Sequence, residues 1–289
     1  MLKRFMLFAI TNLLIMTLIT IIISAFGIDP SLASGYEDLA IICLLWGTGG
    51  AFISLMISKW SAKRMMGLVP LDPHGSHGYV VDALKDFARR EKITVPEVYY
   101  YESDELNAFA TGPSRNNSLI AFSSGLLRDM SKDEVIGVAA HELAHITNGD
   151  MVTMTLVQGI VNAFVMFIAR IVAFAIDNAM RSDDEGEGLG TFAYIILVMI
   201  LQMFFGLLTA PVVAWFSRHR EYRADAGGAK LAGKDKMIAA LQALDNKFSI
   251  DRLDDSQPAL SAMKISGKGR LELLSTHPPL TKRIAALKK

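Results

Sequence analysis

The sequence predicts a mainly helical α+β protein, in which a domain with a small β-sheet is joined to transmembrane helical hairpins. Two observations carry most of this prediction: four long apolar segments, and polar stretches between them in which strand and helix patterns alternate. Hydrophobic residues make up 52% of the 289 residues and charged residues only 20%. A soluble domain usually has about 25% charged residues, so part of this chain is expected to lie in lipid.

Charge and cysteine content exclude several classes of protein. The formal net charge is zero, so no overall basic field points to nucleic acid as a partner. The single cysteine, Cys43, lies in an apolar segment. A disulfide framework is therefore excluded, and a cysteine-based zinc site is not expected.

The apolar segments are long enough to cross a membrane, since a bilayer core needs about 20 apolar residues in a helix. They cover residues 5–28, 39–58, 152–176 and 191–216. The first could be read as a cleaved signal peptide, but its apolar run is too long and a second span follows closely, which favours an uncleaved anchor. Arg170 interrupts the third segment, and a charge within a span usually faces protein or water.

The spans divide the chain into four parts: an N-terminal hairpin (1–58), a first polar part (59–151), a second hairpin (152–216) and a second polar part (217–289). Basic residues such as Lys3, Lys59 and Arg218 flank the hairpins, whereas the hairpin loops are acidic. The positive-inside rule then places both polar parts in the cytoplasm, where they can form one domain.

The first polar part shows regular secondary-structure patterns. Apolar residues at helical spacing predict a helix over 79–90, and strand formers predict strands at 97–101, 106–111 and 118–122. Ser131 and Glu134 form a capping-box pattern, so a helix should run from there to about Thr147. The Asn148-Gly149 pair is a favourable place for that helix to end.

The motif HExxH lies on this helix, as His141, Glu142 and His145. Residues four apart share one helical face, so both imidazoles can reach one metal ion. Glu142 is placed to take a proton from the attacking water as general base. Zinc suits two histidines and a carboxylate, with one coordination position left open. Because HExxH also occurs by chance on ordinary helices, a third ligand is needed to complete the hypothesis.

Three carboxylates are candidates for that third ligand. Glu221 follows the second hairpin, on the same predicted side of the membrane as the histidines. Asp150 and Asp225 are alternatives, because zinc accepts any carboxylate. Asp225 lies one turn beyond Glu221, and could instead accept a hydrogen bond from a ligand histidine and orient it.

The chain as a whole resembles the HtpX-type membrane zinc metallopeptidases, relatives of the zinc-dependent CAAX prenyl endopeptidases within the gluzincins. The resemblance rests on the HExxH helix before a hydrophobic hairpin, the 221–225 segment after it, the 107–112 strand, and the 275–280 motif before Arg283. It implies a gluzincin-type protease domain that binds one Zn²⁺ per chain through His141, His145 and Glu221.

The resemblance also implies roles that the residues alone do not indicate. On sequence alone, 107–112 is an ordinary hairpin strand and His277 is a surface turn residue. The family implies that Asn107, Ala108, Phe109 and Ala110 form an exposed edge that pairs with substrate backbone. It implies that His277, as a catalytic residue, stabilises the oxyanion of the reaction.

The expected function is endopeptidase cleavage of unfolded or damaged membrane proteins, in quality control at the bacterial cytoplasmic membrane. The expected partners are misassembled membrane-protein substrates, the lipid bilayer, and other membrane proteases with which the enzyme cooperates. One alternative is CAAX prenyl-protein processing, although those relatives have more spans. Another is a non-catalytic zinc-binding scaffold, which would not need Glu142. A transporter is disfavoured because the spans contain almost no charge except Arg170.

Overall fold

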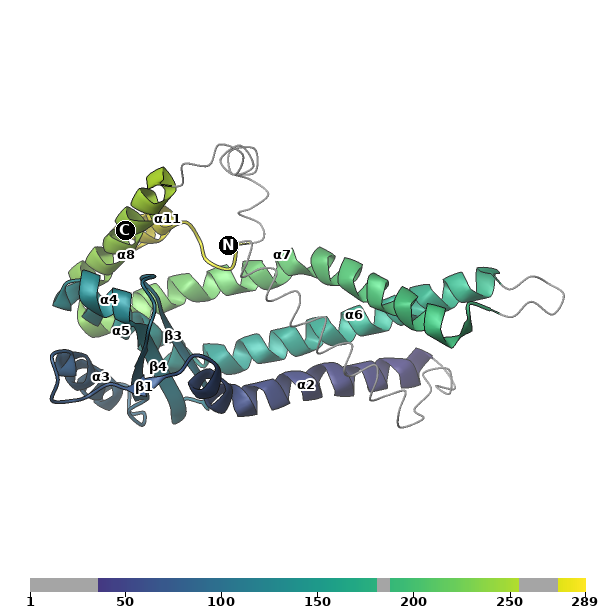
Figure 1. Cartoon of the computed structure of the whole chain (residues 1–289), viewed down its shortest axis with the longest axis horizontal. Helices are drawn as coiled ribbons and strands as arrows, with labels where there is room; N and C mark the ends of the chain where they lie inside the picture. The colour runs from purple at the N-terminus through teal and green to yellow at the C-terminus, as the bar shows by residue number, and fades with distance from the viewer. Residues whose placement is uncertain (1–35, 181–187, 255–274) are drawn as a thin grey trace. The chain divides into compact units, whose positions relative to one another are not determined.

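The computed structural model describes residues 36–180, 188–254 and 275–289 (Figure 1). The first predicted span, 5–28, lies outside the described residues. The chain divides into two compact units. The first takes in Met1–Ile53 and Thr155–Val213, and the second takes in Ser54–Met154 and Ala214–Lys289. We refer to them as the hairpin unit and the site unit.

Three long helices carry the apolar segments within the described residues: α2 (Tyr36–Met65), α6 (Asp150–Met180) and α7 (Gly190–Ala232). Each is long and apolar enough to cross a membrane by length and composition. Pro211 is accommodated within α7. Arg170, which was expected to face protein or water, is only 4% exposed and donates to the Met166 carbonyl of its own helix, so it faces protein.

Helices α2 and α6 approach closely within the hairpin unit. A Cβ atom on Gly47 would lie 2.6 Å from the backbone nitrogen of Ala163, and one on Gly159 would lie 3.1 Å from the Cα of Thr48. Small residues on facing helices allow this approach, as is common where helices pack in membranes. Beside the crossing, Cys43 packs in a small apolar cluster with Met166.

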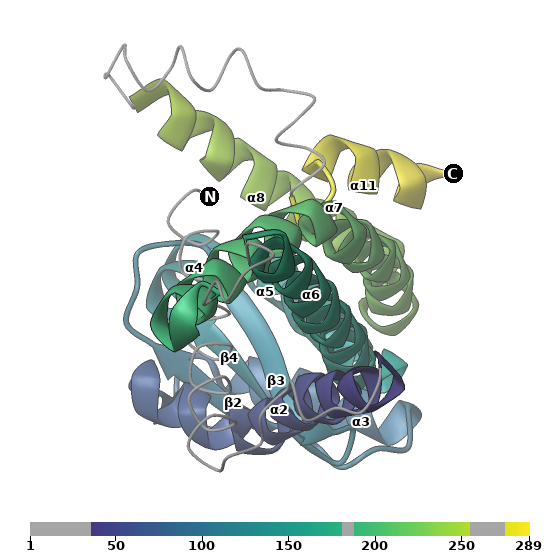
Figure 2. The same cartoon turned by 90° about the vertical axis from the view of Figure 1, so that its right-hand side faces the viewer.

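The site unit contains one four-stranded sheet, drawn in Figures 1 and 2. Its strands are β1 (Val69–Pro70), β2 (Glu97–Tyr101), β3 (Ala108–Ser114) and β4 (Asn117–Ser123), in the order β1-β2-β4-β3. The β2–β4 pairing is parallel and the other two are antiparallel. Strand β3 therefore forms one edge, and it begins two residues later than the sequence predicted and extends further.

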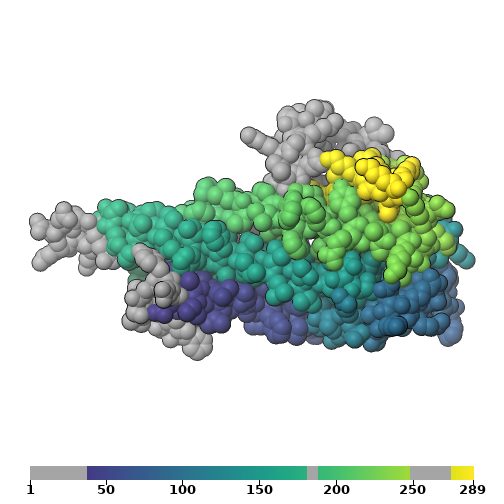
Figure 3. Space-filling model, turned by 180° about the vertical axis from the view of Figure 1, so that it is seen from behind, coloured from purple at the N-terminus to yellow at the C-terminus, as the bar shows by residue number. Residues whose placement is uncertain are grey.

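Shorter helices build the rest of the site unit. They are α3 (Gly78–Arg90), α4 (Ser124–Asp129), α5 (Lys132–Asn148), α8 (Lys234–Asp254) and α11 (Leu280–Lys288). Helix α5 is the central one and packs against α3, α8, β3 and β4, with Leu143 and Phe122 fully buried. The C-terminal α11 lies against α8, as the yellow and yellow-green surfaces of Figure 3 show.

The ends of α5 follow the sequence signals closely. Ser131 Oγ accepts from the Glu134 amide, while Glu134 Oε2 accepts from the Ser131 amide at 2.7 Å, so the capping box is complete. Gly149 ends the helix in the left-handed conformation, with φ 70° and ψ 28°. A residue without a Cβ adopts that conformation at no steric cost.

The end of α2 that belongs to the site unit is fixed to the sheet by charge. Lys59 and Lys63 both pair with Glu97 at the start of β2, and Tyr99 donates to the same carboxylate. Burial by itself would raise the pKa of Glu97, but these hydrogen bonds outweigh burial and lower it to about 2. The carboxylate is thus held ionised at the point where α2 meets β2.

Candidate metal centre

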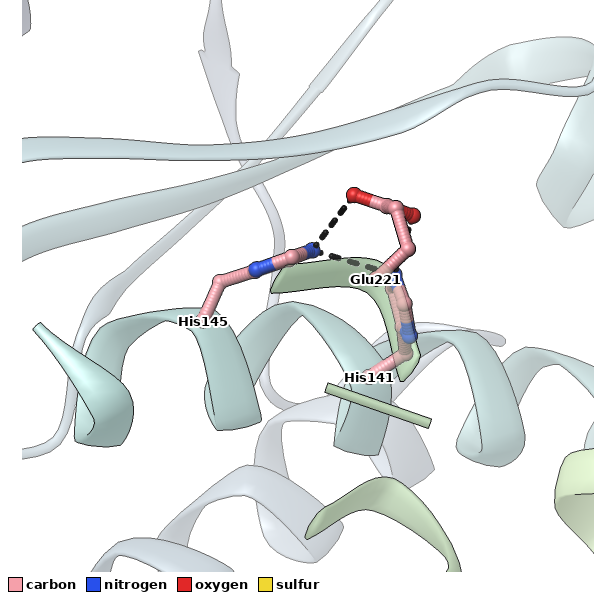
Figure 4. A group of neighbouring side chains, drawn as sticks. All are labelled: His141, His145 and Glu221. Atoms are coloured by element: carbon pink, nitrogen blue, oxygen red, sulfur yellow. Dashed lines mark hydrogen bonds and ion pairs between the residues drawn. The ribbon is translucent and has the colours of Figure 1, made fainter. Parts of the chain in front are cut away.

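His141 and His145 project from one face of α5 toward each other (Figure 4). Both lie in the buried middle of the site unit, with side chains only 10% and 12% exposed. Their Nε2 atoms are 3.1 Å apart, so the same nitrogen of each ring points into a shared space. The spacing of four residues on the helix thus has the effect that the sequence predicted.

Glu221 comes from α7 and faces the two histidines (Figure 4). Its side chain is 1% exposed, and its Oε1 and Oε2 lie 3.4 Å from His145 Nε2 and 3.5 Å from His141 Nε2. Ligand atoms from the three residues all lie within 4.8 Å of one another. Among the described residues this is the one such grouping that could hold a metal ion.

Two glycines allow α7 to bring Glu221 this close. A Cβ on Gly227 would lie 2.8 Å from the Cβ of Ala144, and one on Gly228 would lie 3.1 Å from the backbone nitrogen of His141. Any side chain at either position would meet α5. The Gly-Gly pair therefore sets the distance between the helix with two candidate ligands and the helix with the third.

Each histidine has a carboxylate at its other nitrogen. His141 Nδ1 lies 3.0 Å from Asp225 Oδ1, and His145 Nδ1 lies 2.7 Å from Asp150 Oδ2. Both aspartates are 1% exposed. Of the three carboxylates considered as third ligand, only Glu221 thus faces both Nε2 atoms, while Asp150 and Asp225 bind the far side of the rings.

These contacts also change the acidity of the two rings. Burial by itself would lower the pKa of His145, but its contacts with Asp150 and Glu221 outweigh burial and raise the pKa to about 9. Burial is likewise outweighed at His141, where contacts with Asp225 and Glu221 raise the pKa. A metal ion must displace that proton, because only a neutral imidazole nitrogen coordinates.

The C-terminal segment adds two further groups to the centre. Arg283, on α11, is buried and donates to both oxygens of Asp225, at 2.8 and 2.6 Å. Its Nη1 lies 3.2 Å from Glu221 Oε2. His277 is exposed, but its Nδ1 reaches to within 2.9 Å of the same oxygen. The 275–289 segment thus meets the predicted ligands directly.

Glu142 lies between the two histidines in sequence and is 9% exposed. It interacts electrostatically with His145 and with Arg283. Because Glu142 follows His141 directly on α5, it occupies the position that the general base takes in this motif.

The backbone pairing of β3 identifies which groups face its open edge. The Ser123 amide donates to the Asn107 carbonyl at 2.9 Å, so this is a hydrogen-bonded antiparallel pair. In the same register, Ala108 and Ala110 form the alternate, non-hydrogen-bonded pairs with β4. Their amide and carbonyl groups consequently point away from β4, toward the free edge, and Phe109 packs on Tyr101.

Asn107 differs from the expectation that it belongs to the free edge. It precedes β3, its amide donates to Ser123 Oγ, and its side chain donates to Tyr101 at 2.8 Å. Ser123 Oγ, which also caps α4, thus holds the backbone amide of Asn107. Its polar groups are therefore engaged within the fold.

The sequence alone did not predict the contact of Asp150 with His145 or the close helix packing at Gly227 and Gly228. From the sequence Asp150 is only a candidate ligand, although its position directly after a helix-ending glycine signals a chain that turns back. Two adjacent glycines within a helical pattern also signal a close approach of another backbone.

A helix carrying HExxH, a buried glutamate opposite it and long apolar helices together define the class of membrane-associated metallopeptidases. The chain belongs to peptidase family M48, whose family profile matches residues 76–289.

Curated relatives match this chain over nearly its full length. The chain is 50% identical, over 290 aligned residues and 99% of both chains, to proteins named Protease HtpX from Shewanella oneidensis and from Shewanella halifaxensis. The fold also resembles the crystal structure of S. mikatae Ste24p, with a TM-score of 0.64 and 20% identity. That likeness covers 99% of this chain, which spans 64% of the Ste24p chain.

Proposed function

We propose that this membrane metallopeptidase is a zinc-dependent endopeptidase that cleaves unfolded or damaged membrane proteins at the cytoplasmic face of the bacterial inner membrane. The observation that carries the proposal is the convergence of His141, His145 and Glu221 in one buried cluster beside Glu142. We take one Zn²⁺ per chain as the cofactor.

The donor set fits zinc. Two imidazole nitrogens and one carboxylate are a common catalytic set for this ion, with a fourth position left open. Both oxygens of Glu221 are buried without a hydrogen bond of good geometry, although nitrogens of His277 and Arg283 lie 2.9 and 3.2 Å from Oε2. A metal ion between Glu221 and the two imidazoles would give the buried carboxylate a further positive partner. When bound, the metal would lower the pKa of water and polarise the scissile carbonyl.

The residues of the chain would carry the proton transfers. Glu142 would take a proton from the attacking water and then deliver it to the leaving amine. His277 would donate a hydrogen bond to the carbonyl oxygen as negative charge develops there. His277 is exposed, and its contact with Glu221 through Nδ1 brings the ring beside the cluster. Asp225, held by Arg283, would orient His141.

The open edge of β3 would receive the substrate. An extended peptide that pairs with Ala108 and Ala110 would form backbone hydrogen bonds that do not depend on its sequence, as unfolded substrates require. Helix α5 packs against β3, so a peptide on that edge would run past the catalytic helix. Phe109 would support the strand from its packed face, and we leave Asn107 out of the pairing surface.

The cytoplasmic orientation is supported by charge. Lys59, Lys63 and Arg64 follow the apolar part of α2, and Arg218 and Arg220 follow that of α7. The positive-inside rule assigns these ends to the cytoplasm. A protease in that position would reach misassembled membrane proteins and their loops, and it would share this task with other membrane proteases.

CAAX prenyl-protein processing is the less favoured alternative. The 50% identity over the full chain joins this protein to the HtpX proteases, whereas the likeness to Ste24p at 20% identity concerns the fold. A non-catalytic scaffold is also disfavoured, because such a protein needs no carboxylate at Glu142.

The test is cleavage of casein by detergent-purified full-length protein, with zinc, with a chelator, and with Glu142→Gln. Metal content is measured for each sample. We expect cleavage by the wild type, none with the chelator, and an inert Glu142→Gln protein that still holds zinc. If Glu142→Gln binds zinc and cleaves as well as wild type, Glu142 is not the base and the scaffold reading becomes the better one.

A further inference from the structure

The junction between α5 and α6 is a single residue, Gly149. Its left-handed conformation turns the chain so that the next residue, Asp150, faces back toward the helix that has just ended. The Asp150 carboxylate then meets the His145 ring, with Oδ2 2.7 Å from Nδ1. At 1% exposure this carboxylate is removed from water.

The contact decides which nitrogen of His145 is available. A carboxylate at Nδ1 holds a proton there, so Nε2 is the nitrogen that can coordinate once a metal ion displaces its proton. Nε2 is also the atom that lies 3.1 Å from His141 Nε2 and 3.4 Å from Glu221 Oε1. One orientation of the His145 ring therefore places Nδ1 at Asp150 and Nε2 toward His141 and Glu221.

The position of Asp150 favours its negative charge. It is the first residue of α6, a helix of 31 residues. The N-terminus of a helix carries a partial positive charge and favours an acidic side chain there. The same helix is one of the candidate membrane spans, so the residue that contacts His145 also begins a helix suited to lipid.

We propose that Asp150 is a positioning residue, which fixes His145 with Nε2 toward the metal and links that ligand to the first turn of α6. This inference rests on the proposed function. The Asp150–His145 contact has a counterpart at His141, where Asp225 lies at the equivalent nitrogen, Nδ1. One histidine is oriented from the part of α7 and the other from the start of α6 that belong to the site unit, so the two orienting carboxylates lie on different helices.

The test compares Asp150→Asn and Asp150→Ala with wild type, as full-length protein in detergent. Zinc affinity is measured by competition with a chromophoric chelator, and thermal stability is measured on metal-free samples. Asp133→Asn is the matched control, because Asp133 lies on α5 but is exposed and pairs with Lys236 at the surface. Asparagine preserves the volume of the side chain, so it removes the charge with little effect on packing.

We expect Asp150→Asn to bind zinc about 10- to 100-fold more weakly, the range typical of residues that orient metal ligands. Asp150→Ala should lose more, and Asp133→Asn should match wild type. With cobalt in place of zinc, the visible spectrum should change in both Asp150 variants, because ligand geometry changes.

Two results would overturn the proposal. The first is wild-type zinc affinity and an unchanged cobalt spectrum in Asp150→Asn, even if its metal-free form melts at a lower temperature. That result would make Asp150 a structural residue only, while wild-type cleavage would leave the proposed function intact. The second is a wild-type protein that binds no zinc, which would overturn both proposals together.

Discussion

Replacing Gly227 with alanine should push the two sides of the metal centre apart. The new Cβ would lie 2.8 Å from the Cβ of Ala144 on α5. Carbon atoms in contact are normally about 3.5–4.0 Å apart, so α7 has to move by about 1 Å or α5 has to deform. Metal ligands tolerate displacements of only about 0.2 Å, and Glu221 is less than two helical turns away on the same helix.

The expected magnitudes separate metal binding from stability. Overpacking costs about 1–3 kcal/mol, and the better helix propensity of alanine returns about 1 kcal/mol. The net loss should be about 1 kcal/mol, which lowers Tm by roughly 2–4 °C for a domain of this size. A displaced Glu221 should weaken zinc binding by tenfold or more, which corresponds to about 1.4 kcal/mol.

The assay is zinc competition with a chelator, together with thermal unfolding of metal-free protein. Gly206→Ala is the control, because it makes the same substitution in the same helix at a site with nothing within 4 Å. We expect Gly206→Ala to bind zinc normally. If Gly227→Ala binds zinc as tightly as the control and melts at the same temperature, the two helices do not meet as closely as this reasoning requires.

Further predictions concern other parts of the site unit. Ser131→Ala should destabilise the protein by about 1 kcal/mol in denaturant unfolding, because the cap of α5 is lost; an unchanged midpoint would contradict this. Ala110→Pro should reduce kcat/KM for casein without loss of stability, since the amide it removes faces the free edge, whereas Thr111→Pro should destabilise by breaking the β4 ladder. Glu97 has a pKa lowered to about 2, so its contribution to stability is present above its ordinary pKa of about 4.3 and is lost as pH falls toward 2. Glu97→Gln should therefore lose less stability than wild type over that pH range, and equal losses would show that the carboxylate contributes nothing.

Local signals in the sequence determined much of the catalytic helix. The Ser131 capping box, the helical spacing of His141 and His145, and the stop at Gly149 depend on residues within one or two turns of each other. Such short-range interactions do not need knowledge of the rest of the fold. The long apolar segments could be predicted for a similar reason, because membrane crossing depends on length and composition.

The third ligand could not be chosen in this way. Glu221, Asp225 and Asp150 are all carboxylates near the hairpin, and sequence alone allowed any of them; the family resemblance favoured Glu221. The structure separates them because Glu221 faces the Nε2 side of both rings, while the aspartates bind Nδ1. That distinction depends on how α7 packs against α5, which the Gly-Gly pair permits.

The sequence by itself thus determined the helix with its two histidines and base, the apolar helices and the class of chemistry. Only the tertiary structure decided the roles of the carboxylates, the burial of Arg283 at Asp225, and which β3 groups face the open edge. The physical reason is range. Caps and helical spacing act between neighbours in the chain, whereas Arg283 meets Asp225 and His141 across 58 and 142 positions, and these contacts exist only after the helices have packed.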